Sequence, residues 1–325
     1  MDATIILCTH DRAALLERAL ASLAATVAPV GVNMETVVVA NACRDATAQV
    51  VRSWQDRGVI SNLRLLEEPR LGKSHALNRG VAEAAGDLLI FVDDDHRVAR
   101  DWLATVLAAA QAAPEIPCFC GRIVPDWDGS EPSWVHDQGE YRIRPFPVPN
   151  FDLGPEPCDV ALQGFLPGGG NLFFRKTVLR TVGGFDLHLG PRGHDLGGGE
   201  DVAFVVRVLR AGLPIRYIPG ALQYHYVDPQ RLTWRYIVRK GYQRSRDLRC
   251  STPAPPGRQL AGVPAYLVPQ LLRQLWRVAA TLDTERRRHF LVRSAATCGE
   301  IAGYRQARRA VRAEGTRQAI EGRRR

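Results

Sequence analysis

The chain has 325 residues, 46% of them hydrophobic, which is enough for one large core plus an appendage and favours about two domains. Its formal net charge of +9 is unevenly distributed: residues 231–325 hold 22 bases and six acids, a balance of +16, whereas residues 1–230 are net acidic at −7. No nucleic-acid recognition module accompanies the basic segment, so nucleic-acid binding is disfavoured.

The basic C-terminal third leaves two interpretations open. It forms either a solvated, arginine-rich helical surface or a surface that meets anionic lipid head groups or another acidic partner. Within it, residues 263–282 are the most apolar long stretch, but Arg273, Gln274 and Arg277 interrupt the stretch, so no membrane span is predicted. We expect a cytoplasmic protein that makes, at most, peripheral contact with the inner face of the membrane.

The cysteines indicate neither a disulfide framework nor a zinc site. There are seven, an odd number, and they are scattered along the chain. Cys118 and Cys120 are separated by one residue and have no matching pair elsewhere. Reduced, buried thiols are therefore expected. A strand begins almost at residue 1, so no signal peptide is expected either.

The first half of the chain alternates short apolar runs with amphipathic segments. Strands are predicted at residues 4–8, 37–40, 63–66, 88–92 and 118–124. Helices are predicted at 15–23, from Asp45 or Thr47 onward, at 76–85 and at 101–113. This alternation indicates βαβ units and a parallel sheet, whose right-handed crossovers place the ends of the first, second and fourth strands along one edge. We therefore expect His10, Asn41 and Asp93 to converge there.

The second half begins with a long irregular segment. Residues 125–165 are rich in Pro, Gly, Trp and acids without periodicity, which is typical of a functional loop. A strand is predicted after glycines 168–170, a helix from Glu200 after the glycine-rich loop 194–199, short closing strands at 215–218 and 222–225, and helices at 232–248, 266–282 and 285–311. The pattern predicts an α/β domain over residues 1–230 and a basic helical region over 231–325.

The most informative feature is the triple aspartate Asp93–Asp95, directly after the apolar run 88–92. Ligands bind at the carboxyl ends of strands in open α/β sheets. Three like charges repel unless a cation joins them, and hard divalent cations prefer oxygen ligands. A metal held there would bridge to a phosphate, so the feature indicates phosphate-ester or sugar-nucleotide chemistry. The alternative is a solvated turn or helix cap, but a cap needs only one carboxylate.

Several short motifs, in order, resemble the family 2 glycosyltransferases. They are Cys8-Thr9-His10-Asp11-Arg12, Asn41 to Thr47, Gly72 to Asn78, Phe91-Val92-Asp93-Asp94-Asp95, and Gly184-Phe185-Asp186 followed by Glu200-Asp201 and Arg207. Together they cover about residues 4–226. The resemblance implies a GT-A fold, which is a Rossmann-like mixed sheet flanked by helices, here with a C-terminal α-helical extension. It also implies a nucleotide-diphosphate sugar donor, a Mg²⁺ or Mn²⁺ ion and an inverting displacement.

The resemblance also assigns expected roles to residues. Asp93 would contact the ribose and Asp95 the metal, with His225 as a further metal ligand; for a lone histidine the alternative is a core or surface position. Donor contacts are expected from Thr9, His10, Arg12, Asn41, Lys73, Asp93 and Asp94. Lys73 would add positive charge near the phosphates, unless it is an ordinary exposed lysine at a helix start.

The expected general base is Asp201. A carboxylate within hydrogen-bond reach of the acceptor hydroxyl can take its proton as it attacks the anomeric carbon. The alternative is that Glu200 and Asp201 only complement the helix dipole. Glu200 would orient acceptor hydroxyls, and Gly170 and Asn171 would line the acceptor pocket, since glycine permits close backbone approach to a ligand.

The chain departs from the family pattern at two donor positions. Ala40 stands where many members have an acid that helps read the base or ribose, and His10 replaces a common aromatic residue. UDP, GDP and dTDP therefore all remain possible. The Gln-x-x-Arg-Trp block of processive synthases is absent, which favours transfer of a single sugar to a saccharide, lipid-linked or small-molecule acceptor.

Two other functions are consistent with an α/β sheet bearing aspartates. A nucleotidyltransferase would usually have a glycine-rich basic loop after the first strand, and residues 9–12 lack one. A catalytically inactive nucleotide- or membrane-binding scaffold would have no need to retain both Asp95 and Asp201.

Overall fold

The computed structural model describes residues 2–27, 31–144, 146–193, 198–250 and 255–322, with side chains described as far as residue 309. The chain forms two compact units: Met1–Asp126 with Pro149–Tyr226, and Trp127–Val148 with Val227–Arg325. The second unit thus includes 127–148, a segment that the sequence places in the irregular loop of the first domain.

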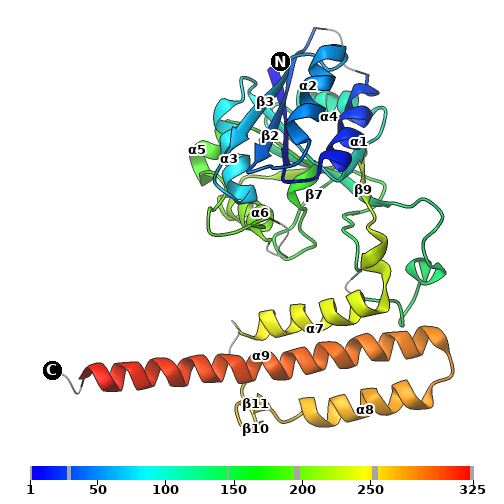
Figure 1. Cartoon of the computed structure of the whole chain (residues 1–325), viewed down its shortest axis with the longest axis vertical. Helices are drawn as coiled ribbons and strands as arrows, with labels where there is room; N and C mark the ends of the chain where they lie inside the picture. Colours follow the sequence, from blue (N-terminus) through cyan, green and yellow to red (C-terminus); the bar gives the residue numbers. More distant parts are fainter. Residues whose placement is uncertain (1, 28–30, 145, 194–197, 251–254, 323–325) are drawn as a thin grey trace. The chain divides into compact units, whose positions relative to one another are not determined.

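The first unit is built on one mixed sheet (Figure 1). Its strand order is β3-β2-β1-β4-β8-β6-β9-β5, with β7 paired to β9. Its strands are β1 (Asp2–Thr9), β2 (Asn33–Asn41), β3 (Leu63–Glu68), β4 (Leu88–Asp93), β5 (His96–Val98), β6 (Cys118–Asp126), β7 (Cys158–Asp159), β8 (Leu172–Arg175) and β9 (Ile215–Tyr226). Strands β1 to β4 are parallel, and β8 runs antiparallel to both β4 and β6. The predicted α/β class and mixed sheet are confirmed.

Helices cover both faces of this sheet. They are α1 (Ala13–Ala24), α2 (Thr47–Arg57), α3 (Lys73–Glu83), α4 (Trp102–Ala112), α5 (Thr177–Val182) and α6 (Glu200–Arg210). Buried residues of α1, α2 and α4 form one core with one face of the sheet, and those of α3, α5 and α6 form a second core on the other face. Strand β1 serves both cores, since Ile5 and Leu7 point to the first and Ile6 and Cys8 to the second, as strand alternation requires.

The details of the fold differ in part from the sequence prediction. The two closing strands are one strand, β9, paired in parallel to β6 with a register shift between Gly121 and Arg122. Strand β5 and helix α5 were not predicted, because three and six residues are too short to show a periodicity. Among its described residues, the long irregular segment 125–165 contains the end of β6 (to Asp126), β7 and the 3₁₀ helix Ser133–His136 as regular structure.

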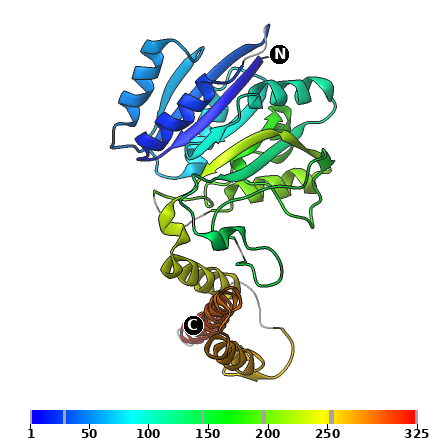
Figure 2. The same ribbon diagram turned by 90° about the vertical axis from the view of Figure 1, so that its right-hand side faces the viewer.

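The second unit is helical. Its main elements are α7 (Trp234–Cys250), α8 (Leu267–Ala280), α9 (Thr284–Gly322) and the small hairpin of β10 (Gln259–Leu260) and β11 (Val263–Pro264). Helix α9 packs between α7 and α8 (Figure 2). Gly299 and Gly303 let α9 approach α7 closely, because a Cβ at Gly299 would lie 2.1 Å from the Tyr242 carbonyl oxygen. Within the described residues, no helix is both long and apolar enough to span a membrane.

Candidate active site

The carboxyl ends of β1, β2 and β4 meet at one edge of the sheet, as predicted. Parallel register places Cys8 beside both Val39 and Asp93. Each strand then opens into a polar loop, so residues that are far apart in sequence are brought together. The His10 ring illustrates this, since its Nδ1 lies 2.6 Å from the carbonyl oxygen of Asn41.

The three aspartates accept hydrogen bonds from Lys73, Thr9 and Arg12. Asp93 accepts a 2.7 Å hydrogen bond from Lys73 Nζ. Asp94 accepts one from Thr9 Oγ1 at 2.7 Å, and Arg12 Nη1 bridges Asp94 and Asp95 at 3.1 and 3.2 Å. Burial, reinforced by the neighbouring charge of Asp95, raises the pKa of Asp94 to about 6. The carboxyl groups of the cluster therefore differ in pKa, which suits them to different roles.

The surroundings of Asp95 hold it in its charged form. Burial opposes its charge, but His225, His96 and Arg12 outweigh burial and hold the pKa of this carboxyl well below its usual range. Asp95 Oδ2 lies 3.6 Å from His225 Nε2, and Asp95 Oδ1 lies 3.9 Å from His96 Nε2. Strand pairing fixes this arrangement, because His96 of β5 is directly opposite His225 of β9. The sequence prediction included Asp95 and His225 but missed His96.

Both imidazoles are oriented by their other nitrogen. His225 Nδ1 lies 2.6 Å from the Tyr226 carbonyl oxygen, and His96 Nδ1 lies 2.5 Å from Gln223 Oε1. A carbonyl oxygen can only accept, so each Nδ1 donates a hydrogen bond and each ring turns its Nε2 toward Asp95. Metal-binding histidines are held in this way by a donated N–H. Two imidazoles and one carboxylate with ligand atoms within 4.8 Å of one another fit a divalent cation.

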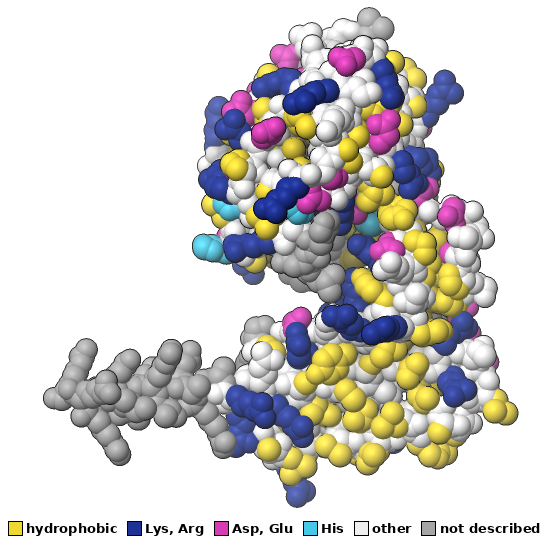
Figure 3. All heavy atoms as spheres, viewed as in Figure 1, with side chains coloured by type: hydrophobic (Ala, Val, Ile, Leu, Met, Phe, Trp, Pro, Cys, Tyr) yellow, Lys and Arg dark blue, Asp and Glu magenta, His cyan; other side chains and the backbone are white. Residues whose placement is uncertain are grey.

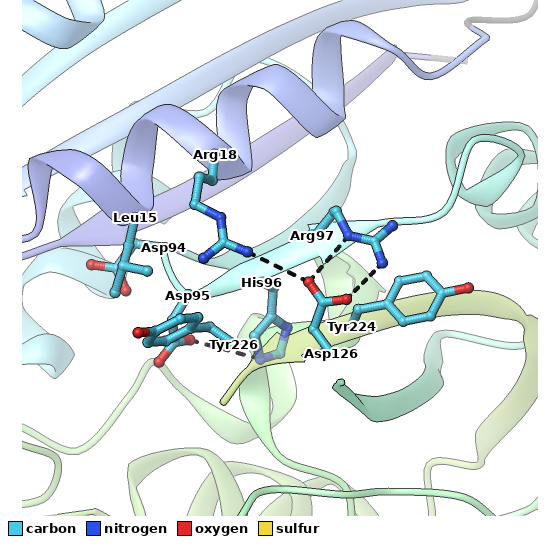
Figure 4. A pocket seen from close by; sticks show the side chains of 9 residues that line it. All are labelled: Leu15, Arg18, Asp94, Asp95, His96, Arg97, Asp126, Tyr224 and Tyr226. Atoms are coloured by element: carbon cyan, nitrogen blue, oxygen red, sulfur yellow. Dashed lines mark hydrogen bonds and ion pairs between the residues drawn. The ribbon is translucent and has the colours of Figure 1, made fainter. Parts of the chain in front are cut away.

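A pocket of about 10 Å³ adjoins this cluster (Figure 4). Asp94, Asp95 and His96 line one end of it, and at the other end Asp126 binds Arg97 at 2.7 Å and Arg18 at 3.7 Å. Two guanidinium groups share one carboxylate at that second end, so its net charge is positive. The carboxylates that can bind a cation lie at the Asp95 end.

Lys73 lies between two carboxylates at the start of α3. Its Nζ is 2.7 Å from Asp93 Oδ1 and 3.8 Å from Glu200 Oε1. Burial disfavours the ammonium, but Asp93 and Glu200 stabilise it and raise the pKa of Lys73. Burial raises the pKa of Glu200, which is 3% exposed and whose Oε2 has no hydrogen-bond partner among the described residues. The Lys73 ammonium and the neighbouring Glu200 carboxyl, which has an oxygen without a hydrogen bond among the described residues, can therefore bind a polar ligand.

Asn41 shapes the loop that leads to Lys73. Its Nδ2 donates to the carbonyl oxygens of Glu68 and Arg70, and its Oδ1 accepts from the Gly72 amide at 2.8 Å. Gly72 has a φ of +139°, which favours glycine. The Asn41 side chain is therefore occupied by the backbone, and it positions Lys73 through this loop.

Asp201 stands at the start of α6 against the glycine loop 168–170. Its Oδ2 accepts from the Gly169 amide at 2.8 Å, and its Oδ1 accepts from the Val202 amide at 2.7 Å. A Cβ at Gly170 would lie 2.6 Å from Asp93 Oδ2 and 2.5 Å from His96 Cε1, so only glycine fits between these side chains. The loop thus links Asp201 to the Asp93–Asp95 cluster. Residues 194–197 of the glycine-rich loop before α6 lie outside the described residues.

Asn171 is buried, and its amide is fully engaged. Its Nδ2 donates to the carbonyl oxygens of Arg122 and Ala221, and its Oδ1 accepts from Trp102 Nε1 and Gln223 Nε2. This network joins β6, β9 and α4 behind the loop 168–170. The amide has no hydrogen bond left for an acceptor hydroxyl, so the geometry favours a structural role.

Asn171→Ala is therefore expected to destabilise the protein by about 3 kcal/mol, because it leaves several buried polar groups unpaired. Urea unfolding followed by circular dichroism measures the change. Asn33→Ala is the matched control, since the Asn33 amide is exposed and donates to the exposed Asp2 Oδ1, and its effect should stay below about 0.5 kcal/mol. Equal stability of the two variants would contradict the structural role.

The fold and the site together define a protein of the GT-A type. Among solved structures, the mannosyltransferase PcManGT from Pyrobaculum calidifontis, in complex with GDP-Man and Mn²⁺, is similar with a TM-score of 0.52 and 21% identity, covering 98% of this chain and 80% of that one. S. aureus TarS 1-349 in complex with UDP gives a TM-score of 0.53 at 16% identity, covering 95% and 92%. Likeness at these identities establishes the fold.

The family model for glycosyl transferase family 2 matches residues 4–176, more than half of the chain, and the chain belongs to this family. A pre-mycofactocin glycosyltransferase of Mycobacterium tuberculosis is 26% identical over 74% of this chain and 46% of its own length. The chain thus spans about half the length of that relative. A glucosyl-dolichyl phosphate glucuronosyltransferase of Haloferax volcanii is 22% identical over 74% of each chain.

Proposed function

We propose that this protein transfers one sugar from a nucleotide-diphosphate sugar to an acceptor hydroxyl, with inversion and with the help of a divalent cation. The observation on which this rests is the cluster of Asp95, His96 and His225 at the strand ends, beside Lys73 and Asp93. Structural neighbours solved with GDP-Man and Mn²⁺, or with UDP, GalNAc and Mn²⁺, support it.

Asp95, His96 and His225 would hold Mg²⁺ or Mn²⁺. When bound, the cation neutralises negative charge that develops on the departing diphosphate, a contribution of several kcal/mol in typical cases. Arg12 forms ion pairs with both Asp94 and Asp95, which reduces the repulsion between these two carboxylates. Lys73 places a further positive charge near the phosphates, and Asp93 holds that ammonium in position.

The donor nucleoside would lie over the loops after β1 and β2. Asp93 is proposed to contact the ribose, and Thr9 orients Asp94. His10 is proposed to stack near the base. Its ring is held by the Asn41 carbonyl and lies 3.7 Å from Asp11. Because Ala40 supplies no acid to read the nucleotide, UDP-, GDP- and dTDP-sugars are the donors to test.

Asp201 is proposed as the general base. The acceptor oxygen forms a bond to the anomeric carbon as the bond from that carbon to the diphosphate oxygen breaks, and the hydroxyl proton passes to an Asp201 oxygen. A carboxylate has about four lone-pair sites, so the two backbone amides that hold Asp201 leave room for this proton. Glu200 and the Gly170 backbone are proposed to border the acceptor, which would be a saccharide, a lipid-linked glycan or a small molecule.

Product analysis tests the proposed function. The full chain is incubated with Mn²⁺ and each UDP-, GDP- or dTDP-sugar, and the released nucleotide is identified. Slow release of nucleoside diphosphate supports the transferase. Release of pyrophosphate would instead indicate a nucleotidyltransferase, and donor binding without turnover of any donor would indicate an inactive scaffold.

His96 provides a separate prediction. His96→Ala is expected to raise the Mn²⁺ concentration for half-maximal activity by about 10- to 100-fold, since it removes one imidazole from the cluster. Activity measured over a Mn²⁺ titration gives this value. His136→Ala, at an exposed histidine of the second unit, is the control and should leave the value unchanged. A wild-type Mn²⁺ response from His96→Ala would remove His96 from the metal site.

A further inference from the structure

Helix α8 buries glutamine side chains and exposes large apolar ones. Gln274 Oε1 accepts a hydrogen bond from Thr297 Oγ1 of α9 at 3.0 Å, and Gln270 Nε2 donates to that threonine oxygen at 3.1 Å. Leu267, at the start of the helix, is also buried. Gln274 is buried, as is Thr297 of α9. Hydrogen bonds between glutamine and threonine therefore hold part of the seam between α8 and α9, which leaves the apolar side chains for the opposite face.

That opposite face is exposed and apolar. The exposed fractions are 44% for Val268, 63% for Leu272, 48% for Leu275 and 69% for Trp276, and Leu282, just beyond the helix, is 97% exposed. The spacing i, i+4, i+7, i+8 places the first four on one stripe. Hydrophobic side chains gather over this part of the second unit in the space-filling view (Figure 3). Single exposed leucines are common, but a continuous stripe marks a binding surface.

Helices α8 and α9 also carry exposed arginines. Residues 261–309 hold nine arginines and three acids. Arg273 is exposed next to the stripe, and Arg287 and Arg293 are exposed on α9. Among the described residues none of these three has an ion-pair partner. A second copy of the chain docked on this face would oppose arginine to arginine, whereas an anionic lipid surface complements both the charge and the apolar stripe.

We propose that the outward face of α8 binds the surface of a bilayer that contains anionic lipid. Leu272, Leu275 and Trp276 enter the boundary between head groups and acyl chains, where the amphipathic indole ring is favoured. The neighbouring arginines remain at the level of the lipid phosphates. Binding there would keep the enzyme next to lipid-linked acceptors, and this use of the surface rests on the proposed function. The lipid binding itself does not depend on the proposed function.

Vesicle co-sedimentation of the full chain tests the proposal. The protein should sediment with vesicles of phosphatidylcholine mixed with phosphatidylglycerol, much less with phosphatidylcholine alone, and less at high salt. Leu272→Gln combined with Trp276→Gln should weaken binding at least about 10-fold, because two large apolar side chains no longer leave water. Arg273→Gln should weaken it about 5-fold and only for the anionic vesicles. Val59→Gln, at an exposed apolar residue of the first unit, should have no effect.

Three results would overturn the proposal: no sedimentation of the unmodified protein with anionic vesicles, equal binding to both vesicle types, or full binding by the Leu272 and Trp276 double variant. A fourth contradicting result can come from sedimentation velocity, which measures the oligomeric state. If the unmodified protein is a dimer, binds no vesicles and becomes monomeric in the double variant, the stripe joins two copies of the chain. No donor or acceptor is present, so failure here is distinguishable from failure of sugar transfer.

Discussion

Asp201→Asn is expected to lower kcat by about 10²-fold or more while the Kd for the donor nucleotide sugar stays within about twofold. The amide has the shape of the carboxylate but cannot accept a proton at neutral pH. The glycine loop keeps its geometry to a good approximation, because the remaining oxygen still accepts from one of the two backbone amides that hold Asp201. Initial rates with saturating acceptor and calorimetric titration of donor measure the two quantities.

The control for Asp201→Asn is Asp283→Asn. Asp283 directly precedes α9 and, like Asp201, accepts a hydrogen bond from a backbone amide, that of Arg286, but it lies in the second unit. Its substitution should leave both kcat and donor affinity unchanged. If Asp201→Asn has the wild-type kcat, Asp201 is not the base. If it loses donor affinity as much as kcat, it acts in donor binding and not in proton transfer.

The sequence predicted the first four strands of the sheet and the site at their ends because both depend on local signals. Apolar runs alternating with amphipathic helices define βαβ units, and polar residues directly after such runs must lie at the carboxyl edge. Asp93, Lys73 and Thr9 fall there in the structure as expected. Position along a strand was enough to place Thr9 and Asp93, because the parallel register aligns the strand ends. Lys73, at the start of α3, reaches the same edge through its hydrogen bond to Asp93.

No such local pattern identifies His96 as a residue of the site. It lies on a three-residue strand, and its partner His225 is 129 residues further along the chain. The only local signal was its place directly after the triple aspartate. Asn41 and Asn171 were predicted to bind ligands, and both lie near the site. Their side-chain amides are hydrogen-bonded to backbone and core groups instead, which no sequence pattern reveals.

The orientation of α8 was also beyond sequence reasoning. The helix itself was predicted at 266–282, and its bounds are Leu267–Ala280. Periodicity identifies two faces of a helix but assumes that the apolar face is the buried one. Here the hydrogen bonds of Gln270 and Gln274 to Thr297 reverse that assumption. Only the tertiary contacts show which face is free.

Asp95→Asn is expected to lower kcat/KM by about 10³-fold and to weaken Mn²⁺-dependent donor binding, because the amide is a poor ligand that cannot balance the charge of a dication. In the unmodified protein, a chelator such as EDTA should abolish turnover, and added Mn²⁺ or Mg²⁺ should restore it. Asp126→Asn is the matched control, since it removes a carboxylate from the same pocket without touching the Asp95, His96 and His225 cluster.

The remaining contacts of the site determine how the Asp95→Asn result is interpreted. Arg12 still pairs with Asp94 in the variant, so the loop after β1 keeps a partner and a general collapse of the site is not expected. Unchanged thermal unfolding confirms this point independently of activity. Turnover of the unmodified protein that persists in EDTA, or an Asp95→Asn variant with wild-type Mn²⁺ affinity, would contradict the metal site. In that case Lys73 and Arg12 would be left to stabilise the departing diphosphate.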